Sequence, residues 1–498
     1  MNINSMFNLT NARKFSNKHK ENYRWKSPYV NRVHDSILEF VGNTPIVKLN
    51  KIPKDHGLSC EIYVKCEFMN PAGSVKDRTA LAMINDAKSI ISEDTHFVEA
   101  TSGNTGIGIS FNAALMNNKC TIVMGEKNST EKVDTMLVLG ADVIQTNKSS
   151  TEIARKIKDS DPDTVVMLDQ FENHCNPKVH YDTTGLEILD ALGDIDMLVA
   201  GAGTGGTITG VGYRIKERIP SCIIIAAEPD GSTMFNEHGK KHSFLVEGIG
   251  GSTVPIVLDK SIVDGYEVVT DEESFLMARE LIKKEGILCG GSSGTALAAA
   301  IKAARKRQLG TGQRVVVIMP DGIRNYMSKF VTNQWMEAHL FMDPPDHTMS
   351  WWKQPVTKLT LSHKYPVVDD KSTCVEALKE MYHQNIAVVV NEKGWFVGVI
   401  TKNSLRHDAT NPTKLPNHNS EDINFNDPVT DHLAKDCYTL AKNGKKGMPT
   451  IGRLSRILDI TPLVVIGVEI HENDSDYFSP ESVVTADDVL DYIFNHRK

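Results

Sequence analysis

From about Ile37 onward, short apolar runs rich in β-branched residues alternate with longer stretches that suit a helix. An expected strand at Glu61–Glu67, for example, precedes an expected helix at Ser74–Lys88. This alternation predicts repeated β-α-β units, and so a layered α/β fold with a largely parallel sheet. The pattern continues to an expected strand at Arg314–Met319 and breaks in the proline-rich stretch Met342–His347, where we expect a linker.

A shorter pattern follows this break. It predicts a helix at Thr373–Asn385, two strands, and a further helix that begins near Lys402. Much of this recurs after Val429, which suggests an internal pseudo-repeat of two units of about 60 residues each. Between them, the polar stretch Asn403–Asp427 is expected to be a loop. The predicted organisation is a disordered extension (residues 1–36), a large α/β domain (37–342), a linker (343–355) and a C-terminal domain pair (356–498).

Composition narrows the class of protein. The chain has 498 residues, 40% hydrophobic and 24% charged, with a net charge of -8. This balance is typical of a folded, multidomain protein and gives no sign of a nucleic-acid binder. The eight cysteines have no metal-ligand spacing, which favours a reduced compartment. No apolar run approaches the ~18 residues of a membrane span, so we expect a cytoplasmic protein without membrane contact.

The N-terminal stretch up to His34 carries seven basic residues against one acid, Glu21, and no apolar segment. Secretion is therefore not expected. A solvated, disordered extension fits this composition better than a mitochondrial presequence, although both interpretations remain open.

Three glycine-rich stretches each follow an expected strand and open an expected helix. Gly201–Gly206 matches G-x-G-x-x-G, and Glu228 lies where a dinucleotide fold places its ribose-binding acid. That stretch alone would indicate an NAD-binding protein. However, Gly103–Gly108 and Gly290–Thr295 are further polar helix starts, more than one dinucleotide requires.

In an open α/β sheet such turns converge on one crevice, where backbone N–H groups hold anions. The stretch Gly203–Thr207 suits a phosphate monoester, because its glycines allow close approach and its threonines add donors. By the same logic, Thr101–Thr105 suits a substrate carboxylate. Each turn taken alone is better explained as an ordinary tight turn, and only the three together favour a binding site.

Lys76 lies at the start of the helix expected after Glu61–Glu67. An amine that is partly desolvated there loses its charge more readily and becomes available as a nucleophile, as a Schiff-base lysine must. The sequence context by itself favours an ordinary surface lysine beside Asp77.

Taken together and in order, these motifs resemble those of fold-type II pyridoxal-phosphate enzymes, and among them the cystathionine β-synthase family. The resemblance covers the chain from Ile37 onward, and the C-terminal pseudo-repeat resembles the tandem regulatory domains of that family. The segments that carry it are Gly73–Arg78, Thr101–Gly106, Gly203–Thr207 and Gly290–Ser292, supported by Leu168–Gln170, His180–Thr184, Val246–Gly250, Pro320–Asp321, Arg324–Met327, Gly452–Leu458 and Val484–Asp488.

The resemblance implies a role for each matching residue. Lys76 would bind pyridoxal 5'-phosphate as a Schiff base, remove the α-proton and help to expel the leaving group. Asn104 would bond the 3'-oxygen, and Ser292 the pyridine nitrogen, which favours β-elimination over transamination. The phosphate would lie on Gly203, Thr204, Gly205, Gly206 and Thr207, and the substrate carboxylate on Thr101, Ser102, Thr105 and Gln170, while Glu247 and Gly248 would border the entry of the second substrate.

The implied reaction is the condensation of L-serine with L-homocysteine to cystathionine and water, a transsulfuration step, with hydrogen sulfide released from cysteine as a side activity. The close alternative is a cysteine synthase that uses O-acetylserine and sulfide, although such enzymes generally lack the C-terminal pair. An NAD-binding protein would leave Lys76 and two glycine-rich stretches unexplained. A catalytically silent scaffold or sensor would not need Lys76, Asn104 and Ser292. The resemblance also implies a homodimer or a higher homo-oligomer.

Three departures from the family pattern qualify these expectations. No cysteine precedes Cys60, so the N-terminal haem site of animal members lacks its thiolate, and we expect no haem and no metal. The segment His383–Ala387 departs from the pattern that holds S-adenosylmethionine, although Thr485 and Asp488 match, which places that regulation in doubt. Phe171 after Gln170 is typical of cysteine synthases and leaves the preferred substrates open.

Overall fold

A computed structural model describes most of the chain after residue 32. The described residues are 33–101, 103–125, 128–146, 148–359, 365–410, 426–434, 437–444, 447–472 and 475–496. The chain divides into two compact units, Met1–Phe40 and Val41–Lys498. Of the expected extension at residues 1–36, only the last four residues are described. All elements named below belong to the second unit.

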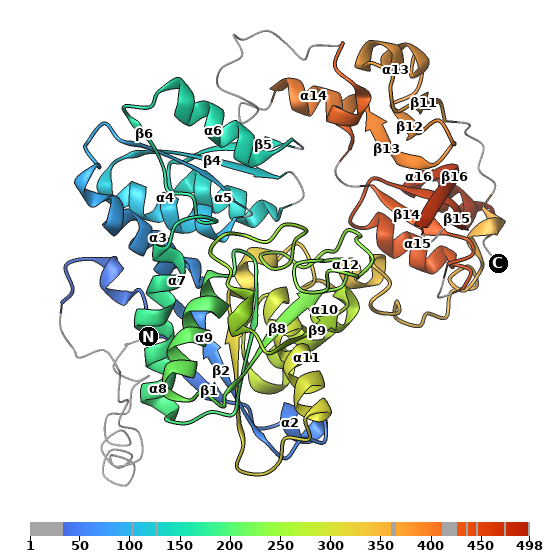
Figure 1. The fold of residues 1–498 in the computed structure, drawn as a ribbon. Coiled ribbons are helices and arrows are strands. Elements are labelled where there is room, and N and C mark those ends of the chain that lie inside the picture. Colours follow the sequence, from blue (N-terminus) through green and yellow to red (C-terminus); the bar gives the residue numbers. More distant parts are fainter. Residues whose placement is uncertain are drawn as a thin grey trace, which may run out of the picture. The chain divides into compact units, whose positions relative to one another are not determined.

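The largest sheet has six strands in the order β1-β2-β10-β7-β8-β9 (Figure 1). Its strands are parallel except for β1, which pairs antiparallel with β2. Consecutive valines of β10 alternate between the two faces: Val315 and Val317 belong to one core, and Val316 to the other. Burial on both faces explains the continuous apolar run. The strands are β1 (Ile46–Lys48), β2 (Glu61–Cys66), β7 (Met197–Gly201), β8 (Ile223–Pro229), β9 (Gly265–Val269) and β10 (Arg314–Met319).

Helices cover both faces of this sheet. One core joins the sheet to α10 (Asp271–Glu280) and α11 (Gly291–Lys306), through side chains such as Phe275 and Leu297. The opposite core joins it to α8 (Gly185–Leu192) and α9 (Gly206–Arg218). The layered α/β fold that the sequence predicts is therefore confirmed.

A second, smaller sheet has four parallel strands in the order β5-β4-β3-β6. Three helices pack on one face and α6 on the other, so this sheet is also sandwiched (Figure 1). Its strands are β3 (His96–Ala100), β4 (Lys119–Gly125), β5 (Asp142–Thr146) and β6 (Val165–Met167), and its helices are α3 (Lys76–Asp86), α4 (Asn104–Met116), α5 (Thr130–Val138) and α6 (Ser150–Ser160). Shorter helices elsewhere are α2 (Ile52–Asp55), α7 (Cys175–Val179) and α12 (Asn333–Ala338).

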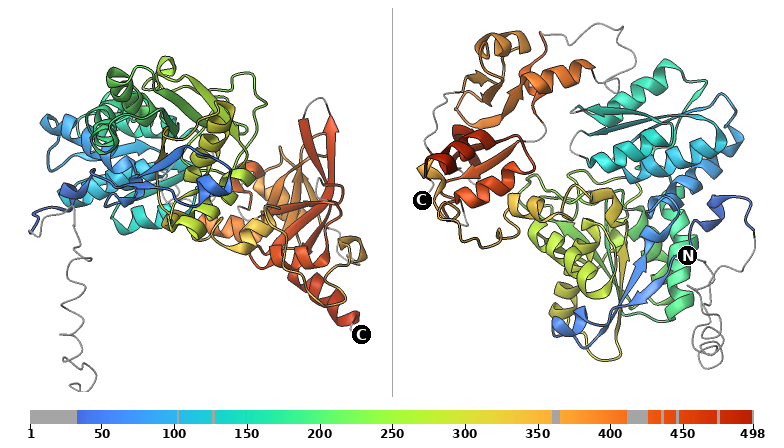
Figure 2. Two further views of the ribbon diagram at one scale, coloured as in Figure 1. Left: turned by 90° about the horizontal axis from the view of Figure 1, so that it is seen from below. Right: turned by 180° about the vertical axis from the view of Figure 1, so that it is seen from behind.

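The C-terminal part contains two three-stranded sheets of the same design, β11-β12-β13 and β14-β15-β16. In each sheet the first strand is parallel to the second, and the second is antiparallel to the third. The hairpin of β15 and β16 is much the longer one (Figure 2). The elements are β11 (Val367–Asp369), α13 (Cys374–Glu380), β12 (Ile386–Val390), β13 (Phe396–Thr401), α14 (Lys402–Thr410), β14 (Tyr438–Ala441), α15 (Ile451–Leu458), β15 (Leu463–Glu472), β16 (Ser475–Thr485) and α16 (Ala486–Asn495).

Two local predictions differ from the structure in this region. The helix expected to begin near Lys402 is confirmed as α14, but it runs to Thr410, into the expected loop at Asn403–Asp427; residues 411–425 lie outside the described part. The helix expected over Thr373–Asn385 ends at Glu380, after a capping box formed by Thr373 and Glu376 at its start. In both places a helical pattern of apolar residues is too short to fix the end of the helix.

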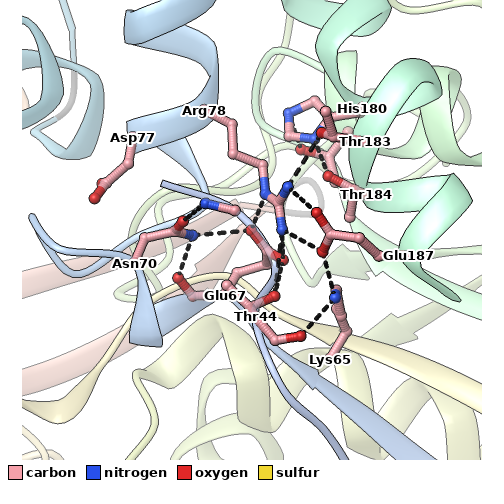
Figure 3. Close-up of polar contacts among 12 residues, drawn as sticks. Thr44, Lys65, Glu67, Asn70, Asp77, Arg78, His180, Thr183, Thr184 and Glu187 are labelled. Atoms are coloured by element: carbon pink, nitrogen blue, oxygen red, sulfur yellow. Dashed lines mark hydrogen bonds and ion pairs between the residues drawn. The ribbon is translucent and has the colours of Figure 1, made fainter. Parts of the chain in front are cut away.

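A buried cluster of charges connects α3 to the large sheet (Figure 3). Arg78 of α3 is 2% exposed, and its guanidinium donates two hydrogen bonds of 2.7 and 2.9 Å to Glu67, which follows β2. It donates two more, of 2.6 and 2.7 Å, to Glu187 of α8, which also accepts 2.6 Å from Lys65. Burial alone would raise the pKa of Glu67, but the charge and hydrogen bonds of Arg78 outweigh it and hold that pKa below its ordinary value. The cluster therefore fixes the helix that begins with Lys76.

We predict that Arg78→Gln lowers the free energy of unfolding by about 3–5 kcal/mol, because Glu67 would be left as an uncompensated buried charge. Urea unfolding followed by circular dichroism measures the change. The matched control is Arg155→Gln, since Arg155 is half exposed and pairs with Glu172 on the surface; it should cost less than about 1 kcal/mol. Equal unfolding midpoints for the two variants would contradict the prediction.

Candidate active site

A cavity of about 560 Å³ is lined by Lys76 and by residues of all three glycine-rich stretches. It opens where β3, β7 and β10 end, and the carboxyl ends of parallel strands are where such sheets bind ligands. All but two of the predicted site residues line it. The lining ones are Lys76, Thr101, Asn104, Thr105, Gln170, Gly203, Thr204, Gly205, Thr207, Gly248 and Ser292. Of the other two, Gly206 begins α9 behind the loop, and Ser102 lies outside the described residues.

Lys76 is the first residue of α3 and faces the cavity. Within the described part of the chain its Nζ has no hydrogen-bond or ion-pair partner. The surrounding protein removes water from the ammonium group, and this desolvation lowers its pKa from 10.5 to about 8. About a tenth of the amine is therefore uncharged at pH 7. Lys76 is partly buried and has the lowered pKa expected of a nucleophile rather than of a surface lysine.

Two glycines allow the backbone conformation and close packing of the loop between β7 and α9. A Cβ on Gly203 would lie 2.3 Å from the carbonyl oxygen of Gly248. Gly205 has a φ of +84°, in the left-handed region that L side chains avoid. The loop ends at the N-terminus of α9, a 13-residue helix, where free N–H groups and the helix dipole favour an anion. Thr204 and Thr207 add hydroxyl groups at the same place.

Two buried side chains behind this loop connect it to the helix of Lys76. Asn176 donates 2.9 Å to the Thr204 hydroxyl and accepts 3.3 Å from Thr79 of α3. His180 Nε2 lies 3.2 Å from Thr207 and 3.3 Å from Thr79. Burial, together with the nearby Lys76 and Arg78 charges, lowers the pKa of His180 far below its ordinary value, so the ring is neutral.

Sequence reasoning did not assign a role to either of these side chains. His180 begins a π-helical turn, His180–Thr184, between α7 and α8. An i→i+5 turn has no signature in a single sequence, and Asn176 lies 28 residues before Thr204, its hydrogen-bond partner. Only the fold brings them together.

Gln170 is held so that its amide can present a hydrogen to the cavity. Its Oε1 accepts 2.5 Å from the Thr105 hydroxyl, and its Nε2 donates 3.3 Å to the carbonyl of Ala100. Behind it, Glu99 accepts 3.0 Å from the backbone N–H groups of both Asp169 and Gln170. Burial raises the pKa of Glu99 to about 8. The second N–H of Gln170 and the backbone at the start of α4 can thus bind a small carboxylate.

A second group of charged side chains lines the cavity. Glu247 is held between Lys132, at 2.7 Å, and Lys329. Burial alone would raise the pKa of Glu247, but the two lysines outweigh it and keep that pKa below its ordinary value. The sequence pointed to Glu247 alone, because the lysines lie 115 and 82 residues away from it.

Glu228 does not act as a ligand-binding acid. It is buried, and its carboxylate accepts 2.7 Å from the Ser232 hydroxyl and 3.1 Å from the backbone N–H of Phe235. It stabilises the turn after β8 and does not line the cavity. The NAD-binding alternative therefore loses the residue on which it depended.

The family model of pyridoxal-phosphate dependent enzymes matches residues 37–321, a range that includes Lys76 and the three glycine-rich stretches at the cavity. A cystathionine beta-synthase of Apis mellifera is 39% identical over 469 residues, which cover 90% of each chain. One of Mus musculus is 44% identical over 400 residues, covering 76% of this chain and 70% of that one. The chain belongs to the cystathionine beta-synthase family.

Solved structures agree with this placement. The O-acetylserine dependent cystathionine beta-synthase of Helicobacter pylori is 37% identical, with a TM-score of 0.56 over 60% of this chain and 98% of that one. A hydrogen sulfide-producing enzyme of Fusobacterium nucleatum is also 37% identical, with a TM-score of 0.56, over 59% of this chain and all of its own. Each of the two solved chains therefore matches about three fifths of this longer chain.

The cavity fits the cofactor of this family, pyridoxal phosphate. A Schiff base needs an amine that can lose its proton, and the Lys76 Nζ is of this kind. A phosphate needs backbone N–H groups and hydroxyl donors, and Gly203, Thr204, Gly205 and Thr207 line the cavity at the N-terminus of α9. The donor set thus includes an amine, a glycine-rich loop at a helix start and hydroxyl groups, all on one cavity.

We predict that Lys76→Met raises the free energy of unfolding of the cofactor-free protein at pH 7 by about 1–3 kcal/mol, since a lowered pKa records the cost of burying the charge. Below the folded pKa of about 8 both states are protonated and the full cost applies. As pH rises toward 10.5 the folded state loses its proton first, so the gain shrinks.

Urea unfolding at pH 7 and at a pH above 9 measures this effect. Lys88→Met is the control, because Lys88 is exposed, and it should change stability little at either pH. A Lys76→Met variant no more stable than the wild type at pH 7 would contradict the prediction.

Proposed function

We propose that this protein condenses L-serine with L-homocysteine to cystathionine and water, and releases hydrogen sulfide from cysteine in a side reaction. The observation that carries the proposal is the cavity in which Lys76 faces both an anion-binding loop and a carboxylate-binding loop. The names of its relatives support it, since the insect and mouse proteins are both cystathionine beta-synthases.

In this proposal each part of the cofactor has a partner in the cavity. Lys76 would hold the cofactor, Gly203–Thr207 would bind its phosphate, Asn104 its 3'-oxygen and Ser292 its ring nitrogen. Pyridoxal phosphate, when bound, withdraws electrons from the α-carbon of an amino acid joined to it. A neutral hydroxyl at Ser292 leaves the ring nitrogen largely unprotonated, which favours elimination at Cβ over transamination.

The first substrate would bind through its carboxylate. Thr101, Thr105 and Gln170 would hold it with the backbone at the start of α4, and Ser102 belongs to the same predicted set. This places the α-carbon toward Lys76, which lines the same cavity.

The Lys76 amine would then transfer the protons of the reaction. Nζ takes the α-proton of serine and passes it to the hydroxyl group that leaves Cβ, so that water forms. The homocysteine thiol adds to Cβ, and the proton that it gives up returns to the α-carbon through Nζ. A pKa of about 8 suits an amine that must both accept and donate a proton near neutral pH. Glu247 and Gly248 would border the entry of the thiol substrate.

One observation favours a second candidate, a cysteine synthase that uses O-acetylserine and sulfide. Phe171, the residue typical of those enzymes, lines the cavity beside Gln170. The Helicobacter pylori relative is, by its description, O-acetylserine dependent. The two candidates share every step at Lys76 and differ in the leaving group and the thiol.

We further propose a division into a catalytic domain (residues 37–342), a linker (343–355) and a regulatory pair (356–498), assembled as a homodimer or higher homo-oligomer. The matching strand order of the two C-terminal sheets supports the pair. Thr485 and Asp488 form a capping box at the start of α16, with hydrogen bonds of 2.8 and 2.9 Å. Regulation by S-adenosylmethionine stays in doubt because of His383–Ala387.

Within the described residues no helix has the length and apolar character that a membrane crossing requires.

We predict that the protein, loaded with pyridoxal phosphate, forms cystathionine from L-serine and L-homocysteine, and that Lys76→Ala abolishes both this activity and the visible absorption band of the covalently bound cofactor. Mass spectrometry of the products and an absorption spectrum measure the two effects. Turnover of O-acetylserine and sulfide without turnover of serine would move the assignment to a cysteine synthase. A sharp Soret band would contradict the expectation of no haem.

We predict that Gln170→Glu raises KM for L-serine by about tenfold or more, because a carboxylate in place of the amide repels the substrate carboxylate and removes a donor to it. Initial rates at varied serine concentration measure KM. Glu172→Gln is the control, since Glu172 is exposed and its nearest charge is Arg155 on the surface. An unchanged KM in Gln170→Glu would exclude Gln170 from the carboxylate site.

A further inference from the structure

Asp321 lies where three cofactor-binding segments meet. It follows β10, and its backbone carbonyl accepts 2.9 Å from the N–H of Gly290, two residues before Ser292. The preceding carbonyl, of Pro320, accepts 2.8 Å from the N–H of Val75, the residue before Lys76. A single turn after the central strand is thus hydrogen bonded to the loops that carry both Lys76 and Ser292.

The side chain of Asp321 reaches the third segment. It is 1% exposed, and its Oδ2 accepts 2.8 Å from Asn104 Nδ2 and 2.5 Å from the Tyr326 hydroxyl. On the other side of the same amide, Asn325 Nδ2 donates 3.0 Å to Asn104 Oδ1. Burial raises the pKa of Asp321, so the orientation of Asn104 rests on the geometry: Oδ2 of Asp321 accepts from Asn104 Nδ2, and Asn104 Oδ1 accepts from Asn325. Both ends of the Asn104 amide are therefore fixed, and one N–H of Nδ2 is left for the cavity.

The buried position of Asp321 lowers the stability of the folded protein. Asp321 Oδ1 is buried and has no hydrogen-bond partner among the described residues. It packs so closely on Gly290 that a Cβ there would lie 2.0 Å away. A buried carboxylate with one unpaired oxygen destabilises a protein, and such exceptions are expected mainly at functional sites. A neutral residue of similar size would fill the same space at lower cost.

We propose that Asp321 is a positioning residue: it orients the Asn104 amide so that an N–H faces the 3'-oxygen of pyridoxal phosphate, and it joins that contact to the loops of Lys76 and Ser292. The inference rests on the proposed function, because it presumes that the cavity holds this cofactor. Asp321 does not itself line the cavity, so it acts through Asn104.

A double-mutant cycle tests the proposal. Wild type, Asp321→Asn, Asn104→Ala and the double variant are titrated with pyridoxal phosphate, and the affinity and the position of the visible absorption band are recorded. Asn at 321 keeps the size of the side chain but can turn a donor toward Asn104. We expect Asp321→Asn to weaken cofactor affinity by about tenfold or more, the value of a hydrogen bond to a charged group, and to shift the band. In the Asn104→Ala background the same change should have no further effect.

Tyr326→Phe is the matched control, because it removes the other hydrogen bond to the same Oδ2 and leaves that of Asn104. Its absorption band should stay in place. If Asp321→Asn does not fold, Asn325→Ala replaces it in the cycle, since Asn325 is only partly buried and fixes the other end of the amide. The expected change is smaller and in the same direction.

Two results would overturn the inference: an Asp321→Asn variant with the affinity and band of the wild type, or an effect that persists undiminished without the Asn104 amide. Thermal unfolding of the cofactor-free variants shows whether such a persistent effect comes only from a general loss of stability. A wild-type protein that takes up no pyridoxal phosphate would overturn the proposed function, and the inference with it.

Discussion

The common direction of the strands determines where the chemistry of this protein can occur. Because β2, β10, β7 and β8 run parallel, each strand end is followed by a turn at the same edge of the sheet, and helices start there with free N–H groups. The smaller sheet adds the helix start after β3. Side chains far apart in sequence, such as Lys76 and Ser292, come to one cavity without any direct contact between them.

The buried polar groups behind the cavity keep this convergence rigid. Arg78 connects the helix of Lys76 to β2 and α8. Asn176 and His180 connect the same helix to the loop Gly203–Thr207. On the far side, Asp321 connects the remaining segments. Each of these groups is almost fully buried and makes at least one hydrogen bond, and buried polar contacts of this kind hold a specific geometry more than they add stability. Few residues line the cavity, and most of the contacts that fix their positions lie behind them.

The sequence was sufficient for the elements whose pattern is local. The strand at Arg314–Met319 has the predicted bounds, because an apolar run fixes them. The helix predicted to open at Gly103–Gly108 begins at Asn104, because a glycine-rich stretch fixes its start. The loop residues that line the cavity were predictable for the same reason. What could not be predicted depends on packing: the length of α13, the pairing of Lys132 with Glu247, and the partners of Asn104. A residue such as Asp321 reads as a turn residue until the loops around it are placed.

The π-helical turn at His180–Thr184 shows what a single residue contributes to such a design. An α-helix advances by about 100° per residue, so one added residue turns everything after it to a different face. Here the turn lets His180 face the phosphate loop while Glu187, seven residues later, faces Arg78. Loss of one residue from this turn would give a more regular helix, but it would send Glu187 away from the guanidinium. The irregularity is what allows one continuous helical segment to present side chains to two different neighbours.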